Sequence, residues 1–166
     1  LYRLVGSEMC IRDRPLIFNN NDRPGIMLSS AVKKYSEFYG VACGSKNVFF
    51  TNNDSAYESA LSLHNKGINV EAIIDIREQS ESKIVKKVKE AGIKVYWSHT
   101  IVDTTGYKRL NSVSIMKLSN DGTSVTGSKI SISCDCLGVA GGWTPSVHLL
   151  SLIHIPEPTR RYRISY

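Results

Sequence analysis

The chain has 166 residues, of which 42% are hydrophobic and 22% are charged, and its formal net charge is +6. This length and composition are typical of one globular domain, and they exclude a collagen-like, low-complexity or disulfide-dense protein. No apolar run approaches the length of a membrane-spanning helix, so the sequence predicts no membrane partner.

The two ends of the chain resemble a translated library adapter. Residues 6–13 can be encoded by a nucleotide stretch whose reverse complement, read one frame over, encodes residues 151–158 with a single difference. Complementary ends of this kind are left on both sides of an insert and do not inform the fold. We expect residues 1–14 and 150–166 to be adapter-derived and not folded, and residues 15–149 to form one domain of a longer protein.

Without these ends the chain is nearly neutral. Residues 15–149 contain fifteen basic and twelve acidic residues, which gives a net charge of +3. The remaining lysines are scattered over the surfaces of predicted helices, where solvated side chains are the usual state. Nucleic acid is therefore not an expected partner.

The cysteines between residues 15 and 149 are odd in number and have neither zinc-ligand spacing nor a Cys-x-x-Cys pair. Cys134 and Cys136 are two residues apart, so we expect them on one face of a strand, packed as small apolar groups. Free thiols fit a reducing compartment, and a cytoplasmic location is expected. Local spacing assembles no metal cluster, no Ser-His-Asp set and no carboxylate pair, so no catalytic residue is predicted.

The first predicted element covers residues 26–39. Arg23-Pro24-Gly25 ahead of it is a turn signal, and Gly40 behind it is a helix stop. The apolar spacing between these signals predicts an amphipathic helix.

Residues 47–77 are predicted to form a strand, a tight turn, a helix and a second strand. Residues 48–50 are a short apolar run of the kind found in strands that are covered on both faces. The helix begins at Ser55, which has capping-box spacing with Glu58. Residues 68–75 form the second strand.

Residues 81–91 predict another amphipathic helix, with aliphatic side chains on one side and lysines largely on the other. This helix and the preceding one each end in glycine and lead into a strand that opens Ile-x-Val. That is the rhythm of a β-α-β-α-β sheet. Beyond His99 the period shortens, and residues 101–132 predict three short strands joined by turns, a β-meander.

A last strand, residues 134–139, runs into the glycine pair Gly141-Gly142. A glycine pair lets the backbone approach a ligand closely, and in open α/β sheets ligands bind at the carboxyl ends of the strands. The turn after residue 50 stands where a dinucleotide-binding protein carries its glycines, and Asp75 stands where an acidic group meets the adenosine ribose and favours NAD over NADP. The predicted cofactor-binding residues are Thr51, Asn52, Asn53, Asp54, Ser55, Asp75, Gly141 and Gly142.

This turn contains no glycine, and its chemistry leaves two interpretations open. The Asp54 carboxylate is expected near the start of the helix, where it would cap free N–H groups and repel a pyrophosphate. The turn is then either a divergent NAD site or a structural relic of the fold.

Three stretches resemble one family. Asn21–Leu28, Phe50–Tyr57 and Gly141–Leu149 look like parts of the alpha subunits of heterotetrameric sarcosine oxidases. More broadly, the order of elements and the closing turn Ala140–Pro145 resemble the NAD domain of pyridine-nucleotide-dependent flavoprotein oxidoreductases. The resemblance implies an α/β, Rossmann-like FAD/NAD(P)-binding domain over residues 15–149, with a central parallel sheet, helices and a three-stranded β-meander.

The resemblance also implies a function. Such complexes demethylate sarcosine with oxygen, release glycine and hydrogen peroxide, and pass the one-carbon unit to tetrahydrofolate. FAD and the amine site belong to a partner subunit, FMN lies at an interface, and the alpha subunit contributes an NAD-binding region. We therefore expect an oxidoreductase fragment that is inactive alone and that binds the other subunits of a hetero-oligomeric oxidase, with the small-molecule substrate held in a partner subunit. The alternatives are a subunit of a related flavoprotein, such as an opine oxidase or a cyanide synthase, and a non-catalytic scaffold.

Overall fold

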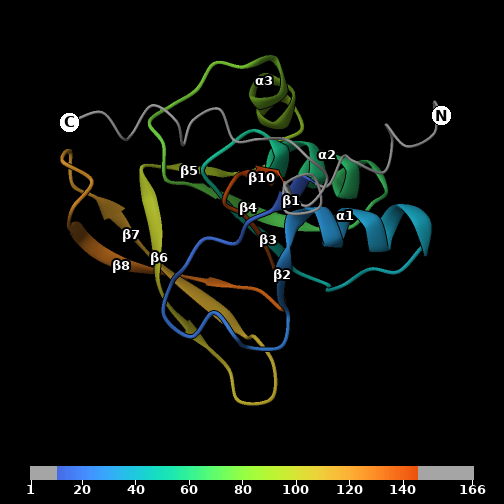
Figure 1. The fold of residues 1–166 in the computed structure, drawn as a ribbon, viewed down its shortest axis with the longest axis horizontal. Coiled ribbons are helices and arrows are strands. Elements are labelled where there is room, and N and C mark those ends of the chain that lie inside the picture. The colour runs from blue at the N-terminus through green and yellow to red at the C-terminus, as the bar shows by residue number, and fades with distance from the viewer. Residues whose placement is uncertain (1–10, 146–166) are drawn as a thin grey trace, which may run out of the picture. The chain divides into compact units, whose positions relative to one another are not determined.

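The computed structural model describes residues 11–145 (Figure 1). Most of the two stretches that the sequence predicts to be adapter-derived lie outside the described residues, as does the end of the Gly141–Leu149 motif. The chain divides into two units, of which the larger is Asp13–Gly142. The strands β1 (Ile11–Asp13) and β10 (Trp143–Pro145) pair in a two-stranded sheet.

The larger unit is organised around a five-stranded parallel sheet. Its strand order is β2-β9-β3-β4-β5, so the chain moves outward from β3 to β4 and β5 and returns on the other side of β3 as β9. The strands are β2 (Ile26–Leu28), β3 (Asn47–Thr51), β4 (Val70–Asp75), β5 (Val95–Trp97) and β9 (Cys136–Ala140).

The central strand β3 is buried on both faces, as its apolar run predicts. Phe49 packs into a cluster on the helix side of the sheet, whereas Val48 and Phe50 pack into a separate cluster on the opposite side. Successive side chains of a strand alternate between its faces, so one apolar run contributes to both cores.

Three helices cover one face of the sheet, and α1 and α2 lie side by side (Figure 1). Val32, Leu63 and Val88, one from each helix, belong to the cluster that contains Phe49. No helix in the described part of the chain is long and apolar enough to span a membrane. The helices are α1 (Ser29–Phe38), α2 (Ser55–Asn65) and α3 (Lys83–Glu90).

The opposite face is covered by an antiparallel sheet of order β6-β7-β8, which confirms the predicted meander. Ile101 and Ile115 from this sheet pack into the cluster that contains Phe50. The unit therefore has three layers, and the predicted α/β class is confirmed. The strands are β6 (His99–Thr105), β7 (Ser112–Leu118) and β8 (Val125–Ser133).

The helix predicted over residues 26–39 begins later than expected. Ile26–Leu28 forms β2, which pairs in parallel with β9, and α1 starts only at Ser29. Three consecutive apolar residues suit a buried parallel strand as well as a helix, and only the neighbouring strand decides between them. Gly25 turns the chain into β2 at a φ of 103°, and its carbonyl accepts a hydrogen bond from the Leu137 N–H at 2.8 Å.

The expectation that Cys134 and Cys136 share one face is wrong. Cys134 is buried on the meander side of the sheet and Cys136 on the helix side. β9 begins only at Cys136, so strand alternation does not extend back to Cys134, whose N–H donates to the Asn111 carbonyl at 3.1 Å. Burial raises the pKa of each thiol to about 12, so both are protonated packing groups at neutral pH.

Gly138 lies in β9 beside Phe49, and an added Cβ would lie 2.6 Å from Phe49 Cε1. We expect Gly138→Ala to lower the free energy of unfolding by about 1–3 kcal/mol through overpacking, as measured by urea denaturation. In a Phe49→Leu background the same substitution should cost less, because the colliding ring is gone. An equal cost in both backgrounds would contradict this packing.

Candidate functional site

The carboxyl edge of the parallel sheet has a switch point between β3 and β9. From β3 the chain continues to β4 on one side, whereas β9 pairs with β3 on the other side. In open α/β sheets, ligands bind in the crevice that such a reversal leaves at the carboxyl ends of the strands. The turn after β3 and the glycine pair after β9, both singled out from the sequence, meet at this crevice.

The turn after β3 is held by side chains rather than by glycines. Thr51 Oγ1 accepts a hydrogen bond from the Asn53 N–H at 3.0 Å and donates one to the Asn53 carbonyl at 2.8 Å. Asn53 Oδ1 accepts from the Ser55 N–H at 2.9 Å and from the Ser55 hydroxyl at 2.5 Å. Side-chain turns of this kind fix a tight bend locally, and no residue of the turn has a positive φ.

The start of α2 differs from the predicted capping box. The side chain that accepts a hydrogen bond from an N–H at the helix start belongs to Asn53 and not to Ser55. Glu58 does not complete a capping box, because its Oε2 lies 4.0 Å from Nζ of Lys33 in α1. The expected capping by Asp54 is also wrong, because its side chain makes no cap hydrogen bond. Its Oδ1 accepts from Arg77 Nη2 at 2.8 Å, a charge-assisted bond that is stronger than one to a neutral N–H.

The turn is tied to β9 on its other side. The Asn52 N–H donates to the Ala140 carbonyl at 3.3 Å, and Asn52 Nδ2 donates to the Gly141 carbonyl at 3.4 Å. A Cβ on Gly141 would lie 2.7 Å from the carbonyl oxygen of Arg14, so this glycine makes room for the chain's own backbone. Gly142, at a φ of 106°, borders open space. Of the predicted glycine pair, Gly142 is therefore the residue that can face a ligand.

Asp75, at the end of β4, is completely buried. Its Oδ2 accepts hydrogen bonds from the Tyr57 hydroxyl at 2.7 Å and from Arg77 Nη2 at 2.8 Å. Its Oδ1 accepts from the Arg77 N–H at 2.9 Å and from Arg77 Nε at 3.1 Å. An ionised carboxylate offers about four acceptor positions, so these donors use its whole capacity.

Arg77 joins two carboxylates. Its Nη2 lies 2.8 Å from both Asp75 and Asp54, so it fastens the end of β4 to the turn after β3. The hydrogen bond to Asp75 holds the pKa of Arg77 above its ordinary value, and burial together with Asp75 does the same for the pKa of Tyr57, whose phenol stays neutral. We refer to Asp54, Tyr57, Asp75 and Arg77 as the carboxylate clamp.

Sequence reasoning missed Tyr57 and the partner of Asp54. Tyr57 has the spacing of an ordinary core residue of α2, and its ring stacks on Trp97 with centroids 6.0 Å apart. Its hydrogen bond with Asp75 joins α2 to β4, and residue spacing within one element cannot predict such a contact. The sequence shows Arg77 as a cation two residues after Asp75, but it does not predict the hydrogen bond to Asp54.

The polar groups of the crevice lie beside the N-terminal end of α2. Within residues 11–145, no group of His, Cys, Asp and Glu side chains is arranged to hold a metal ion. The start of α2 directs the positive end of its dipole toward the crevice, an arrangement that attracts anions. Such a site can position a phosphate-containing ligand.

Arg77→Gln should lower the free energy of unfolding by about 3–5 kcal/mol, because it leaves the buried Asp75 carboxylate without its cation. Asp54→Asn breaks only a partly exposed pair and should cost less than about 1 kcal/mol. Lys83→Gln, at the exposed start of α3, serves as the charge-matched control and should change nothing. Chemical denaturation ranks the three variants, and equal losses for Arg77→Gln and Asp54→Asn would refute the clamp.

The fold is shared with solved oxidoreductase structures. A thioredoxin reductase from T. acidophilum matches with a TM-score of 0.64 and 19% identity, over 82% of this chain and 43% of that one. A 2-naphthoyl-CoA reductase matches with a TM-score of 0.65 and 15% identity, over 87% and 21%. An NAD-dependent persulfide reductase from A. fulgidus matches with a TM-score of 0.57 and 16% identity, over 86% and 26%. At these identities the likeness shows the fold alone, and it confirms the predicted Rossmann-like FAD/NAD(P)-binding class.

Sequence comparison is more specific, although no family profile matches the chain. The sarcosine oxidase subunit alpha of Corynebacterium sp. strain P-1 is 40% identical over 141 residues, which cover 84% of this chain. The same subunit of Rhizobium meliloti strain 1021 is 31% identical over 159 residues, or 90% of this chain. In both cases the match spans 14% of the relative's length. Over that stretch, the chain belongs to the family of sarcosine oxidase alpha subunits.

Proposed function

We propose that the chain is the nucleotide-binding part of the alpha subunit of a sarcosine oxidase complex. In this proposal the complex demethylates sarcosine with oxygen to glycine and hydrogen peroxide, passes the one-carbon unit to tetrahydrofolate, and works in the cytoplasm. FAD, FMN and the amine site belong to other parts of the complex. This chain contributes an NAD site and no catalytic residue.

One observation carries the NAD proposal: the junction of the turn after β3 with the end of β9. Asn52 bonds the two segments together at the switch point, directly beside the start of α2. A pyrophosphate over the first turn of α2 would meet the positive end of the helix dipole. Asp54 is turned toward Arg77, so the charge expected to repel that group is paired and does not cap the helix.

The proposed roles follow the chain's order. Thr51, Asn52, Asn53, Asp54 and Ser55 form the pyrophosphate side, and Gly141 and Gly142 form the neighbouring wall. Asp75 acts on the adenosine side by fixing Arg77 at the end of β4. NAD supplies redox or structural chemistry of its own once bound, while these residues bind and orient it.

The second candidate function is a non-catalytic scaffold, which the glycine-free turn and the covered Gly141 favour. An opine oxidase or cyanide synthase subunit would share the NAD site and differ only in the substrate of the complex. NAD binding therefore separates the scaffold from the other two, and the substrate is decided by activity of the assembled complex.

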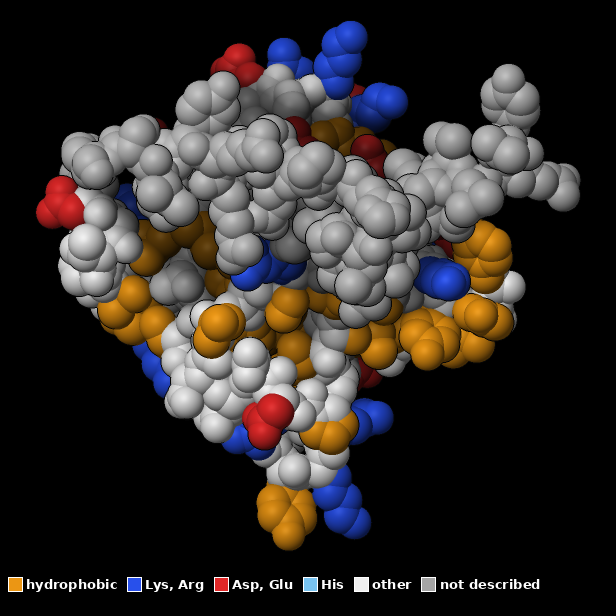
Figure 2. Space-filling view, in the orientation of Figure 1, with side chains coloured by type: hydrophobic (Ala, Val, Ile, Leu, Met, Phe, Trp, Pro, Cys, Tyr) orange, Lys and Arg blue, Asp and Glu red, His pale blue; other side chains and the backbone are white. Residues whose placement is uncertain are grey.

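Apolar side chains gather over the C-terminal end of α1, where Figure 2 shows them in orange. Tyr35, Phe38, Tyr39 and Val41 are between 46% and 76% exposed there. Contiguous exposed aromatic groups are typical of protein contacts. This surface supports the proposal that the domain packs against other parts of a hetero-oligomeric oxidase.

Ser55→Asp tests the NAD site, and thermal unfolding of the variant is measured alongside, because the substitution also removes the Ser55 hydroxyl that donates to Asn53 Oδ1. A carboxylate in the first turn of α2 stabilises the helix dipole but repels a pyrophosphate. We expect calorimetric titration of the full chain with NAD to show binding for the wild type and a loss of at least about tenfold in affinity for the variant, since one like charge at close range costs more than 1.4 kcal/mol.

Ser82→Asp is the matched control, because it places the same charge at the start of α3, away from the crevice. Its affinity for NAD should equal that of the wild type. No heat of binding for the wild type at millimolar NAD would reject the cofactor proposal and leave the scaffold.

A further inference from the structure

A groove of about 430 Å³ lies between α2 and α3. Glu58, Leu61, Ser62 and Asn65 line it from α2, and Ile84 lines it from α3. The four residues of α2 follow the i, i+3, i+4, i+7 spacing of one helix face, and none of them is among the residues that α2 buries. The groove therefore opens on the outer surface of the helix layer.

The floor of the groove is apolar. Leu61 and Ile84 both pack against the core cluster that contains Phe49, yet each of them is only half-buried. The rest of their apolar surface lines the groove. A concave apolar surface between helices is the kind of site that receives the apolar face of an amphipathic helix.

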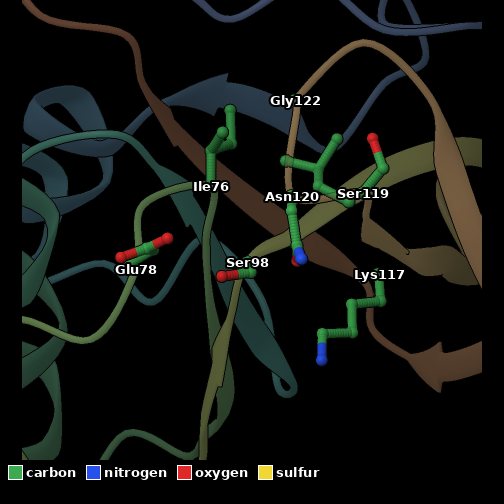
Figure 3. A pocket seen from close by; sticks show the side chains of 8 residues that line it. Ile76, Glu78, Ser98, Lys117, Ser119, Asn120 and Gly122 are labelled. Carbon is green, nitrogen blue, oxygen red and sulfur yellow. The ribbon is translucent and has the colours of Figure 1, made fainter.

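Another hollow of the described chain has a different character. The pocket in Figure 3, of about 340 Å³, is lined by Glu78 and Lys117 together with neutral residues such as Ser98 and Asn120. Its two charged groups are of opposite sign, so they favour neither an acidic nor a basic partner. The surroundings of the groove between α2 and α3 have one dominant sign of charge.

The net positive charge of the domain is located on α3. Residues 15–149 contain fifteen basic and twelve acidic residues, whereas α3 alone contains four lysines and one glutamate, so each has a net charge of +3. The rest of the domain is balanced, with eleven residues of each sign. Figure 2 shows basic side chains gathered over α3 at the top of the view.

The lysines of α3 have no anionic partner in the part of the chain that the structure describes, because no ion pair there includes them. Lys89 Nζ lies 5.7 Å from the centre of the Trp97 ring. Lys83, Lys86 and Lys87 are exposed. Lys83 and Lys87 are four residues apart, and like charges at this spacing destabilise a helix. An acidic partner would remove that cost.

Two of the domain's cations border the groove itself. Lys87 lies three residues after Ile84, so their side chains are neighbours on α3. Lys66 lines the groove from the end of α2, and its Nζ donates to the Ser36 carbonyl at 2.8 Å, which holds the charge in place without neutralising it. The acidic lining residue, Glu58, is about two helical turns away from Lys66. The apolar floor therefore has a cation on each side.

We propose that the groove between α2 and α3 binds an acidic amphipathic helix of a partner protein. Aliphatic side chains of that helix lie between Leu61 and Ile84, and its carboxylates face Lys66 and Lys87. An apolar centre inside a charged rim is the usual anatomy of a protein interface. This inference goes beyond the proposed function, because it does not depend on a bound nucleotide.

A protein helix fits this surface better than the other common anionic surfaces. A lipid bilayer takes up apolar side chains that project from a protein, whereas Leu61 and Ile84 line a hollow. Nucleic acid binds through arrays of phosphate contacts, which make no use of an apolar floor. Only a partner with both aliphatic and acidic side chains uses all parts of the groove.

The test uses the full chain and two synthetic peptides of about 20 residues, a length above that at which isolated helices are marginal. Both peptides carry leucines on one helix face, and the positions beside the leucines are glutamates in one peptide and lysines in the other. We expect the acidic peptide to bind and the basic peptide to bind at least about tenfold more weakly. Fluorescence anisotropy of the labelled peptides gives both affinities.

Lys87→Glu reverses the charge beside the groove at an exposed position. It should weaken the acidic peptide at least about tenfold and strengthen the basic one. Lys108→Glu is the matched control, because it makes the same change of charge at an exposed residue between β6 and β7. This control should keep the wild-type preference.

Ile84→Ala removes part of the apolar floor and leaves the lysines in place. It should weaken both peptides several-fold and leave the ratio of their affinities unchanged. Because Ile84 also packs against the core, thermal unfolding is measured alongside to show that the variant is folded.

Three results would overturn the inference: equal binding of the two peptides, an unchanged preference in Lys87→Glu, or no peptide binding by the wild type. In the last case, binding of phosphatidylcholine–phosphatidylserine vesicles or of a DNA duplex would assign the lysines to a different anionic surface. Peptide binding and NAD binding are separate measurements, so failure of one leaves the other standing.

Discussion

The buried carboxylate of Asp75 is the constraint on which the carboxyl edge of the sheet depends. A charge without solvent access is costly unless it is paired and hydrogen-bonded, so its donors must be held in place. Tyr57 supplies one from α2 and Arg77 supplies the rest from the chain just after β4. The helix and the strand are thereby locked in one relative position at the point where the crevice opens.

This pairing determines what happens at the start of α2. Arg77 Nη2 also donates a hydrogen bond to Asp54 Oδ1. Asp54 is paired with Arg77 and does not hold the turn after β3. Side-chain hydrogen bonds of Thr51 and Asn53 hold this turn, which contains no glycine. The result is a helix start free of its neighbouring carboxylate, beside a glycine that borders open space. The same pairing leaves Asp75 without acceptor capacity for a ligand.

Local patterns of the sequence were sufficient for most of the fold. The apolar run of β3, the glycines after α2 and α3 and the shorter period beyond residue 99 each act over a few residues, and the structure confirms the elements they predict. The three-residue strand β2 could not be separated from a helix, because its identity depends on pairing with β9. The two cysteines were misplaced for a similar reason, since the first residue of β9 is determined by the ladder and not by spacing.

In the candidate site too, features that follow from local patterns could be predicted, and features that depend on tertiary contacts could not. The turn and the glycine pair could be located from their places after strands, because parallel strands end at one edge. The partners of Asp54 and Asp75 could not, because Arg77 and Tyr57 reach them across separate elements.

The most direct test of the account is where NAD contacts the chain. Amide chemical shifts of the isotope-labelled full chain should be recorded by NMR during titration with NAD. We expect saturable shifts at residues 52–56 and at Gly142, with none along the exposed strand β8. Shifts confined to other surfaces, or no shifts at saturating NAD, would contradict a dinucleotide site at this edge.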